Sequence, residues 1–281
     1  SKLYICVFFL CVASLTSLRA QTLPLSHGER VDYDLYFKWG LIMSKAGLAT
    51  LSVKESEDQG APSWHYNLLF RSAGVIEKVF RMRDTMDRLS LVGSEMCIRD
   101  RRDTMDCHYS KEPRLLFSSK RTNEGDYYLV DNLQFEYQGS GRIDIHSHRH
   151  TLKETKIDTM LMAKGRVFDM LGATMYLRSL DWRTMSYGAE FPFMIAIGRE
   201  LVNARFRYTG QQIVEHKEAK FRTRHFYIDI YDEAFSQAKE AAEVWIGDDE
   251  NHIPVKIRAK LKIGAAEVYY KDSYNLRAPL T

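Results

Sequence analysis

Hydrophobic and polar residues alternate along most of the chain from residue 30 onward, the pattern of strands with one buried face. Apolar residues take every second position from Val31 to Trp39. Similar runs occur at 49–53, 64–70, 115–117, 127–137 and 142–150, with turn residues between them. Three or four more follow residue 190. The last and clearest pair runs from Ile253 to Ile263 and returns after Gly264. The pattern predicts an antiparallel sheet of about ten strands.

Two segments break this alternation with helical spacing. Residues 75–80 are long enough for one or two turns, whereas Phe168 to Leu180 is a longer stretch. Leu171 and Met175 lie with Phe168 on one stripe, and Asp169 stands near the start, where a carboxylate favours the helix dipole. We therefore expect one principal helix.

No Pro-rich or Ser-rich linker divides the chain, so residues 21–281 are predicted to form a single domain. A sheet of this length normally curls on itself. The predicted fold is mainly β: a curled antiparallel sheet forming a barrel or half-barrel, with the helix packed at its open side.

The first twenty residues have the features of a secretory signal peptide. Lys2 precedes an apolar run from Leu3 to Leu15, and Ala20 ends the segment at the expected cleavage site. The run is shorter than the roughly 20 residues that span a bilayer, and no second apolar segment approaches that length. Residues 1–20 therefore predict export, and the mature chain is expected to have no transmembrane span.

One short sequence occurs twice. Residues 83–87 read RDTMD and recur identically at 102–106, with a foreign-looking segment, 88–101, between the copies. Genuine repeat architectures use longer units in at least three copies. We interpret residues 88–106 as a sequence artefact forming a loop, so that the natural chain reads FRMRDTMDCHYSKEP. The alternative is a genuine loop insertion.

Several stretches together resemble secreted proteins of Bacteroidetes-type Gram-negative bacteria, catalogued as domain of unknown function 3108. They are GERVDYDLYFKWG (28–40), KAGLATLSV (45–53), KRTNEGDYYLVD (120–131), VFDMLGATMYLRSLD (167–181) and VWIGDDENHIPVKI (244–257). The closing hairpin is also similar to the one in lipoprotein-carrier proteins that ferry acyl chains across the periplasm on a curled sheet. The resemblance implies a β fold and the periplasm or outer membrane as location, and it implies no reaction.

Composition and motifs exclude some classes of function. Forty Lys and Arg against 37 Asp and Glu give a net charge of +3, too small for a general nucleic-acid binder. The sequence holds no GxSxG, GxxxxGK[ST], HExxH, CxxC or GxGxxG motif. We therefore expect a non-enzymatic protein with no cofactor.

Six aromatic residues fall on the apolar faces of the early strands, and in a loosely closed sheet they line a cavity for an acyl chain or another apolar ligand. In a tightly closed sheet the same residues are core. These candidate ligand-binding residues are Tyr33, Phe37, Trp39, Trp64, Tyr66 and Phe70.

Two polar patterns are further candidates. The basic stripe, consisting of Lys256, Arg258, Lys260 and Lys262, lies opposite the apolar face of its strand and can meet an anionic envelope surface or simply face solvent. The triplet of His146, His148 and His150 shares one strand face and is a weak candidate for a metal site. Nearby cations and the lack of a fourth ligand favour a polar surface without metal.

Two hypotheses about function follow. The first is an exported periplasmic or cell-envelope protein that binds or carries a lipid-like ligand. The second is a structural or accessory envelope protein with a filled core, which acts through a protein partner.

Overall fold

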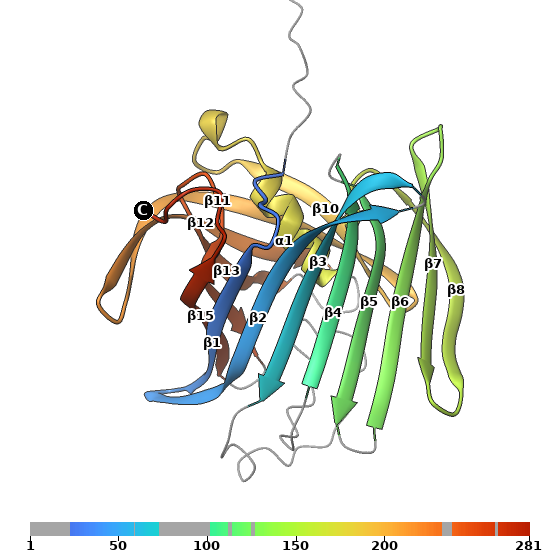
Figure 1. Cartoon of the computed structure of the whole chain (residues 1–281), viewed down its shortest axis with the longest axis horizontal. Coiled ribbons are helices and arrows are strands. Elements are labelled where there is room, and N and C mark those ends of the chain that lie inside the picture. The colour runs from blue at the N-terminus through green and yellow to red at the C-terminus, as the bar shows by residue number, and fades with distance from the viewer. Residues whose placement is uncertain are drawn as a thin grey trace, which may run out of the picture.

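The structure is a computed structural model that describes residues 23–58, 60–72, 102–111, 114–124, 127–231, 238–261 and 264–281. Fifteen strands, one α-helix and one short 3-10 helix lie within these ranges (Figure 1). The strands are β1 (Arg30–Trp39), β2 (Ile42–Asp58), β3 (Ala61–Ser72), β4 (Arg102–Ser110), β5 (Leu115–Glu124), β6 (Tyr127–Tyr137), β7 (Arg142–Thr151), β8 (Thr155–Lys164), β9 (Val167–Phe168), β10 (Glu190–Ile197), β11 (Glu200–His216), β12 (Ala219–Tyr231), β13 (Ala238–Gly247), β14 (Pro254–Lys260) and β15 (Ala265–Tyr274). The helices are α1 (Met170–Ser179) and η2 (Trp182–Thr184).

All strands belong to one sheet, in which nearly every strand pairs with its neighbour in sequence. The order runs from β8 back to β1, continues through β15, and ends at β9. The first and last strands of the chain are therefore partners in the middle of the sheet, where β1 pairs antiparallel with β15. The two edges, β8 and β9, come from the middle of the chain.

The sheet curls until its two edges approach each other. Close to this seam, the Ser147 hydroxyl on β7 donates to the Gly198 carbonyl in the β10–β11 turn at 2.6 Å. The Arg199 guanidinium in the same turn donates to the Lys156 carbonyl on β8 at 3.1 Å. These bonds join β7 and β8 to the β10–β11 turn without strand pairing, so the barrel is nearly closed.

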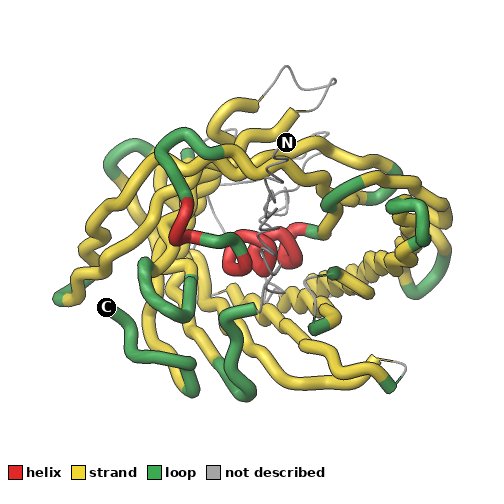
Figure 2. Tube along the Cα trace, turned by 90° about the horizontal axis from the view of Figure 1, so that it is seen from above, coloured by secondary structure: helices red, strands yellow, loops and turns green. Residues whose placement is uncertain are grey.

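Helix α1 lies inside the ring of strands, as the view from above shows (Figure 2). Asp169 caps its first turn by accepting from the Gly172 amide at 2.6 Å. Leu171, Met175 and Leu177 are buried in the main core, together with inward-facing side chains of the sheet. The helix therefore fills the interior of the barrel at the end where residues 23–29 enter it.

The predicted class of fold is confirmed, with two corrections. The sheet has fifteen strands within the described residues, not ten. The principal helix is in the interior instead of covering an open side. Longer strands than expected, such as the seventeen residues of β2, let the sheet close around the helix.

Three sequence predictions concern residues that lie wholly or partly outside the described ranges. The predicted signal peptide, the short helix at 75–80 and residues 88–101 lie outside the described residues. The second RDTMD copy, 102–106, forms the first half of β4 and pairs with β3. Because both copies are identical, removing either one with the intervening segment leaves the same sequence for β4.

Candidate functional site

A buried ion pair fixes α1 to the start of β1. The Arg178 guanidinium donates to the two carboxylate oxygens of Glu29 at 2.7 and 3.0 Å. It also donates to the backbone carbonyls of Pro24 and Asn251 at 3.1 and 2.9 Å. Both charged side chains are almost fully buried. A buried charge needs this degree of pairing, because leaving water costs each ion several kcal/mol.

Two tyrosine side chains point toward this ion pair. Tyr33 on β1 and Tyr66 on β3 are both buried. The Tyr66 hydroxyl interacts with the Arg178 guanidinium, whereas the Tyr33 hydroxyl has no hydrogen-bond partner among the described residues. Burial raises the pKa of each well above its usual value, so both stay neutral. The Nε of Arg178 is also without a partner. The Tyr33 hydroxyl thus retains hydrogen-bonding capacity in this closed region.

The other end of α1 is held by β4. The Cys107 thiol donates to Asp169 Oδ1 at 3.2 Å, and the Tyr109 hydroxyl donates to the Gly172 carbonyl at 2.6 Å. Burial raises the pKa of Asp169, and burial followed by the nearby Asp169 carboxylate raises the pKa of Cys107. A fully buried thiol with a raised pKa is a poor nucleophile. This cluster positions the helix.

Beyond the helix, the inner face of the barrel carries apolar side chains that remain partly exposed. Directly paired residues on neighbouring strands face the same side, so the register identifies the inward-facing positions. The inner wall is the set of Leu35 on β1, Leu68 on β3, Met105 on β4, Ile257 on β14 and Val268 on β15. All five pack on the main core and all are partly accessible to solvent.

One cross-strand row shows how the inner wall changes from apolar to charged. Val31 pairs with Leu51, which pairs with Leu68 and then Met105. The row continues through Lys120, Asp131, Arg149 and Ile157. Arg149 donates to Asp131. The inner face therefore joins an apolar half to a half with two cations and one carboxylate, an arrangement suited to an amphiphilic ligand.

The structure does not bring the six predicted aromatic residues together in one cavity lining. Tyr33 and Tyr66 are buried beside Arg178, and Phe37 is buried in a separate small cluster with Ala46. Trp64 packs at the edge of the main core, with the Lys111 ammonium 3.7 Å from its ring centre. Phe70 is partly exposed and faces inward, level with Ala49.

Trp39 departs most from its predicted place. It ends β1 at the β1–β2 turn, with 52% of its surface exposed, and lies outside the interior. Alternation places Trp39 on the inward side of β1, but the strand continues past the start of β15, which pairs only as far as Lys38. Within the described residues, β15 does not extend far enough to cover it.

The basic stripe is partnered by acidic residues of neighbouring strands. Arg258 lies 3.8 Å from Glu243 and 3.6 Å from Glu267, and Lys260 lies 3.5 Å from Glu240. The Lys256 ammonium lies 4.6 Å above the Trp245 ring. Lys262 is outside the described residues.

The three histidines lie on the outer face of β7. Their ring centres are 6.2 Å apart between His146 and His148, and 5.0 Å apart between His148 and His150. His146 is paired with Asp158 on β8, at 2.6 Å between Nε2 and Oδ1. In the part of the chain that the structure describes, no group of three His, Cys, Asp or Glu side chains is placed to hold a metal ion.

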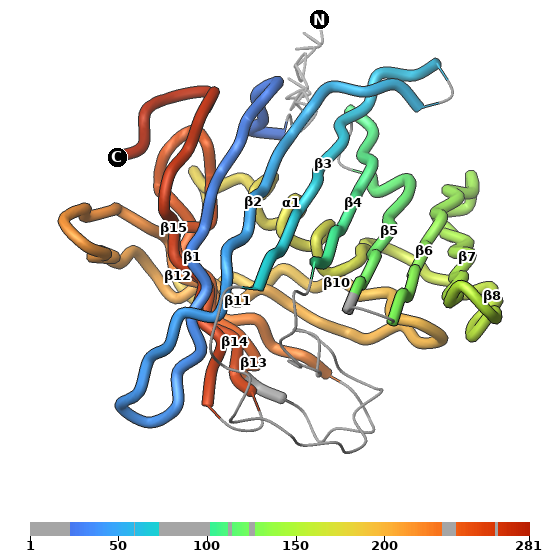
Figure 3. The backbone as a smooth tube through the Cα atoms, turned by 60° about the horizontal axis from the view of Figure 1, so that its bottom comes forward, coloured from blue at the N-terminus to red at the C-terminus, as the bar shows by residue number. Residues whose placement is uncertain are grey.

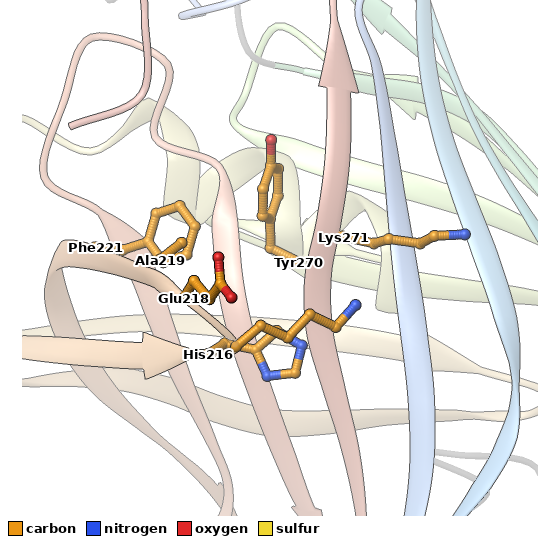
Figure 4. A pocket seen from close by; sticks show the side chains of 7 residues that line it. His216, Glu218, Ala219, Phe221, Tyr270 and Lys271 are labelled. Atoms are coloured by element: carbon orange, nitrogen blue, oxygen red, sulfur yellow. The ribbon is translucent and has the colours of Figure 1, made fainter.

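A shallow groove of about 320 Å³ lies between the β11–β12 turn and β15 (Figure 4). His216 stacks on Tyr269 beside it, with 4.5 Å between ring centres, and the Lys217 ammonium is 3.3 Å from Asp34. Burial lowers the pKa of His216, so its ring is mainly neutral at pH 7. These contacts hold the long β11–β12 hairpin against β1 and β15. The residues beside the groove therefore have a structural role.

The sequence contains a signal for the buried ion pair that hydrophobic alternation alone does not reveal. Arg178 lies three residues after Met175, on the apolar stripe of α1, where a cation needs a buried partner. The partly exposed inner wall could not be identified in this way, because alternation indicates which side a residue faces and not how much space lies in front of it.

Comparison with known proteins defines the family. The family model described as "Protein of unknown function (DUF3108)" matches residues 32–271. The chain belongs to the DUF3108 family. No match is found among curated proteins.

Among solved structures, this DUF3108 chain is similar to the crystal structure of a beta-barrel-like protein of domain of unknown function DUF1849 from Brucella abortus. The two share 10% sequence identity, with 89% of this chain and 99% of that chain covered and a TM-score of 0.53. At this identity the likeness concerns the fold alone. In the described ranges, no helix is long and apolar enough to cross a bilayer.

Proposed function

We propose that this DUF3108 protein is an exported, non-enzymatic envelope protein that binds a lipid-like ligand against the inner wall of its barrel. The observation that carries the proposal is the partial exposure of inward-facing Leu35, Leu68, Met105, Ile257 and Val268. Apolar side chains on the inside of a barrel are normally buried by one another. An apolar ligand that covers the side chains left accessible removes their surface from water, which favours binding.

The charged half of the same face suits the polar end of such a ligand. An acyl chain gains about 0.8 kcal/mol for each buried CH₂ group, so a chain of moderate length outweighs the entropy lost on binding. Lys120 and Arg149 can meet a carboxylate or phosphate, while Leu68 and Met105 contact the chain in the same cross-strand row. A fatty acid or a phospholipid has this chemistry.

Native mass spectrometry tests the proposal directly. The protein is purified from a Gram-negative periplasm, and its lipids are extracted and identified. We expect a stoichiometric lipid bound to the protein. A mass that matches the bare polypeptide in every preparation would rule out tight lipid carriage.

A pair of variants on β3 tests the location of the site. Leu68 faces inward and its neighbour Leu69 faces outward, and both are partly exposed. We expect Leu68→Gln to weaken binding of a fluorescent fatty acid about tenfold, because it places an amide in the acyl contact. Leu69→Gln is the matched control and should bind as the unaltered protein does. Equal affinities for the two variants would contradict a site on the inner wall.

A second candidate is an accessory envelope protein that acts through a protein partner. The observation in its favour is that α1 and the core residues around Arg178 fill one end of the barrel completely. A bare protein mass, together with co-purification of one envelope protein in constant ratio, would support this candidate over the carrier.

A further inference from the structure

The turn between β1 and β2 presents a group of large apolar side chains to solvent. Residues 39–43, here called the hairpin tip, extend beyond the neighbouring strands (Figures 1 and 3). Exposed fractions are 52% for Trp39, 104% for Leu41, 61% for Ile42 and 45% for Met43. Scattered apolar residues on a surface are ordinary, but four in five consecutive positions form a patch that favours a binding surface.

The base of the hairpin tip is held firmly against the barrel. Strand pairing continues to the last pair, Trp39 with Ile42. Phe37 and Ala46 are buried behind the tip with Leu261 packed against them. Gly264 lies so close to the Lys38 carbonyl that a Cβ atom there would be 2.2 Å from the oxygen. The β14–β15 turn therefore supports the tip, which is presented as a fixed wedge.

Four exposed cations lie on or against β1 and β15 behind this apolar wedge, while their acidic partners are buried. The Asp34 carboxylate, 3% exposed, is shared by Lys45 at 2.7 Å and Lys217 at 3.3 Å. The Glu267 carboxylate, also 3% exposed, is shared by Lys38 at 3.9 Å and Arg258 at 3.6 Å. Each carboxylate thus faces two cations whose side chains are between 41% and 58% exposed. The charge that reaches solvent beside the tip is positive.

We propose that the hairpin tip docks on an anionic lipid surface, with its apolar side chains in the interfacial region and the surrounding lysines at the headgroups. Tryptophan and long aliphatic side chains flanked by lysine are the residues that favour this boundary. Anionic headgroups supply the complementary charge. A protein partner would need its own acidic rim around an apolar pocket, whereas the bilayer surface provides both.

The hairpin tip and α1 lie toward opposite ends of β1. β1 runs toward the tip from Glu29, at the level of α1, through the inner-wall residue Leu35. The tip and the partly exposed inner wall are therefore displaced in the same direction from the helix. A bilayer at the tip lies on the side away from the filled end. Docking rests on the exposed tip and the neighbouring cations, and it does not require the proposed ligand.

Vesicle flotation with the full chain tests the proposal. The vesicles contain phosphatidylethanolamine with 30% phosphatidylglycerol, and pure phosphatidylcholine vesicles serve as the neutral comparison. We expect at least tenfold more protein bound to the anionic vesicles, with binding reduced by 0.5 M salt. Equal binding to both vesicle types, or binding to neither, would overturn the proposal.

Variants at highly exposed positions separate docking from folding. We expect the double substitution Leu41→Asp and Ile42→Asp to reduce vesicle binding at least tenfold, without altering circular dichroism. Leu152→Asp is the matched control, because Leu152 is 81% exposed in the β7–β8 turn at the same end of the strands. Unchanged binding of the double variant would overturn the proposal. So would loss of an envelope protein partner from the double variant in the absence of any vesicle binding.

Trp39 fluorescence reports insertion at the residue itself. The chain has four tryptophans, so the signal of Trp39 is the difference between the unaltered protein and Trp39→Phe. This difference should move to shorter wavelength on anionic vesicles and be quenched by brominated acyl chains. The Leu68→Gln variant should still bind vesicles. The ligand proposal can therefore fail while docking holds, and docking can fail while the ligand proposal holds.

Discussion

At the scale of single residues, the pairing of Arg178 with Glu29 joins three segments of the chain that are distant in sequence. It connects the last turn of α1, the segment before β1 and the turn before β14 through Asn251. The Arg178 carbonyl also accepts from His252 at 2.7 Å. A buried pair with all this bonding fixes the geometry more than it adds stability.

Removing one member of the pair should be strongly destabilising. We expect Arg178→Met to lower the free energy of unfolding by about 3–5 kcal/mol, because Glu29 is left charged and buried. Urea unfolding followed by circular dichroism measures the loss. The double variant Glu29→Leu with Arg178→Met should recover part of it. Arg183→Met, at a side chain that is 79% exposed, is the control and should change stability by less than about 0.5 kcal/mol. A loss as small as that of the control would contradict the role assigned to the pair.

How far the sequence predicts the site also becomes clear at this scale. Alternation correctly places Tyr33, Tyr66 and Phe70 on the inward side. It cannot tell that α1 covers the first two, because that depends on contacts between residues more than a hundred positions apart. It also misplaces Trp39, because the length of the neighbouring strand decides burial there.

At the scale of elements, α1 is the best-predicted feature and the strands after residue 190 the least. Helical spacing predicts a helix between Phe168 and Leu180, and α1 occupies Met170–Ser179 with Asp169 as its cap. The strand number exceeds the prediction in part because β4 begins in the segment interpreted as an artefact, and because β8 and the two-residue β9 lie outside the alternating runs from which strands are predicted.

The seat of α1 against β4 leaves no room at Gly172. A Cβ atom there would lie 2.7 Å from Asp169 Oδ1 and 2.7 Å from the Tyr109 hydroxyl oxygen. Alanine normally stabilises a helix relative to glycine. Here we expect Gly172→Ala to lower stability by about 1–3 kcal/mol, because the cap and the tyrosine must move. Thermal unfolding measures it, with Gly139→Ala, which meets nothing within 4 Å, as control. A stabilised Gly172→Ala variant would show that the helix is free to shift.

At the scale of the whole molecule, the barrel is a ring whose opening does not coincide with the chain ends. Asn275 donates to the Gly28 carbonyl at 3.2 Å, so the segments flanking β1 and β15 lie side by side. The seam is between β8 and β9, which are consecutive in the chain. This allows the chain to be reconnected without altering any strand pair.

A circular permutant tests this arrangement. Joining Thr281 to Leu23 through a short flexible linker and opening the chain at Gly165 should preserve the fold, because Gly165 lies between the two edge strands and has open space around it. We expect the same circular dichroism and an unfolding midpoint within a few degrees. Opening at Leu51, in the middle of β2, is the control and should abolish folding. Loss of structure on opening at Gly165 would show that the seam is tighter than the bonds across it indicate.

The pairing of β1 with β15 also sets the order in which a newly made chain can complete itself. β1 is among the first segments to be synthesised, yet its second partner is not available until residue 274 has been made. Until then one side of β1 is an open strand edge, with its amides and carbonyls unpaired and prone to association. β15 thus ends this exposure, and a chain truncated before β15 is two half-sheets, each with one more edge to protect.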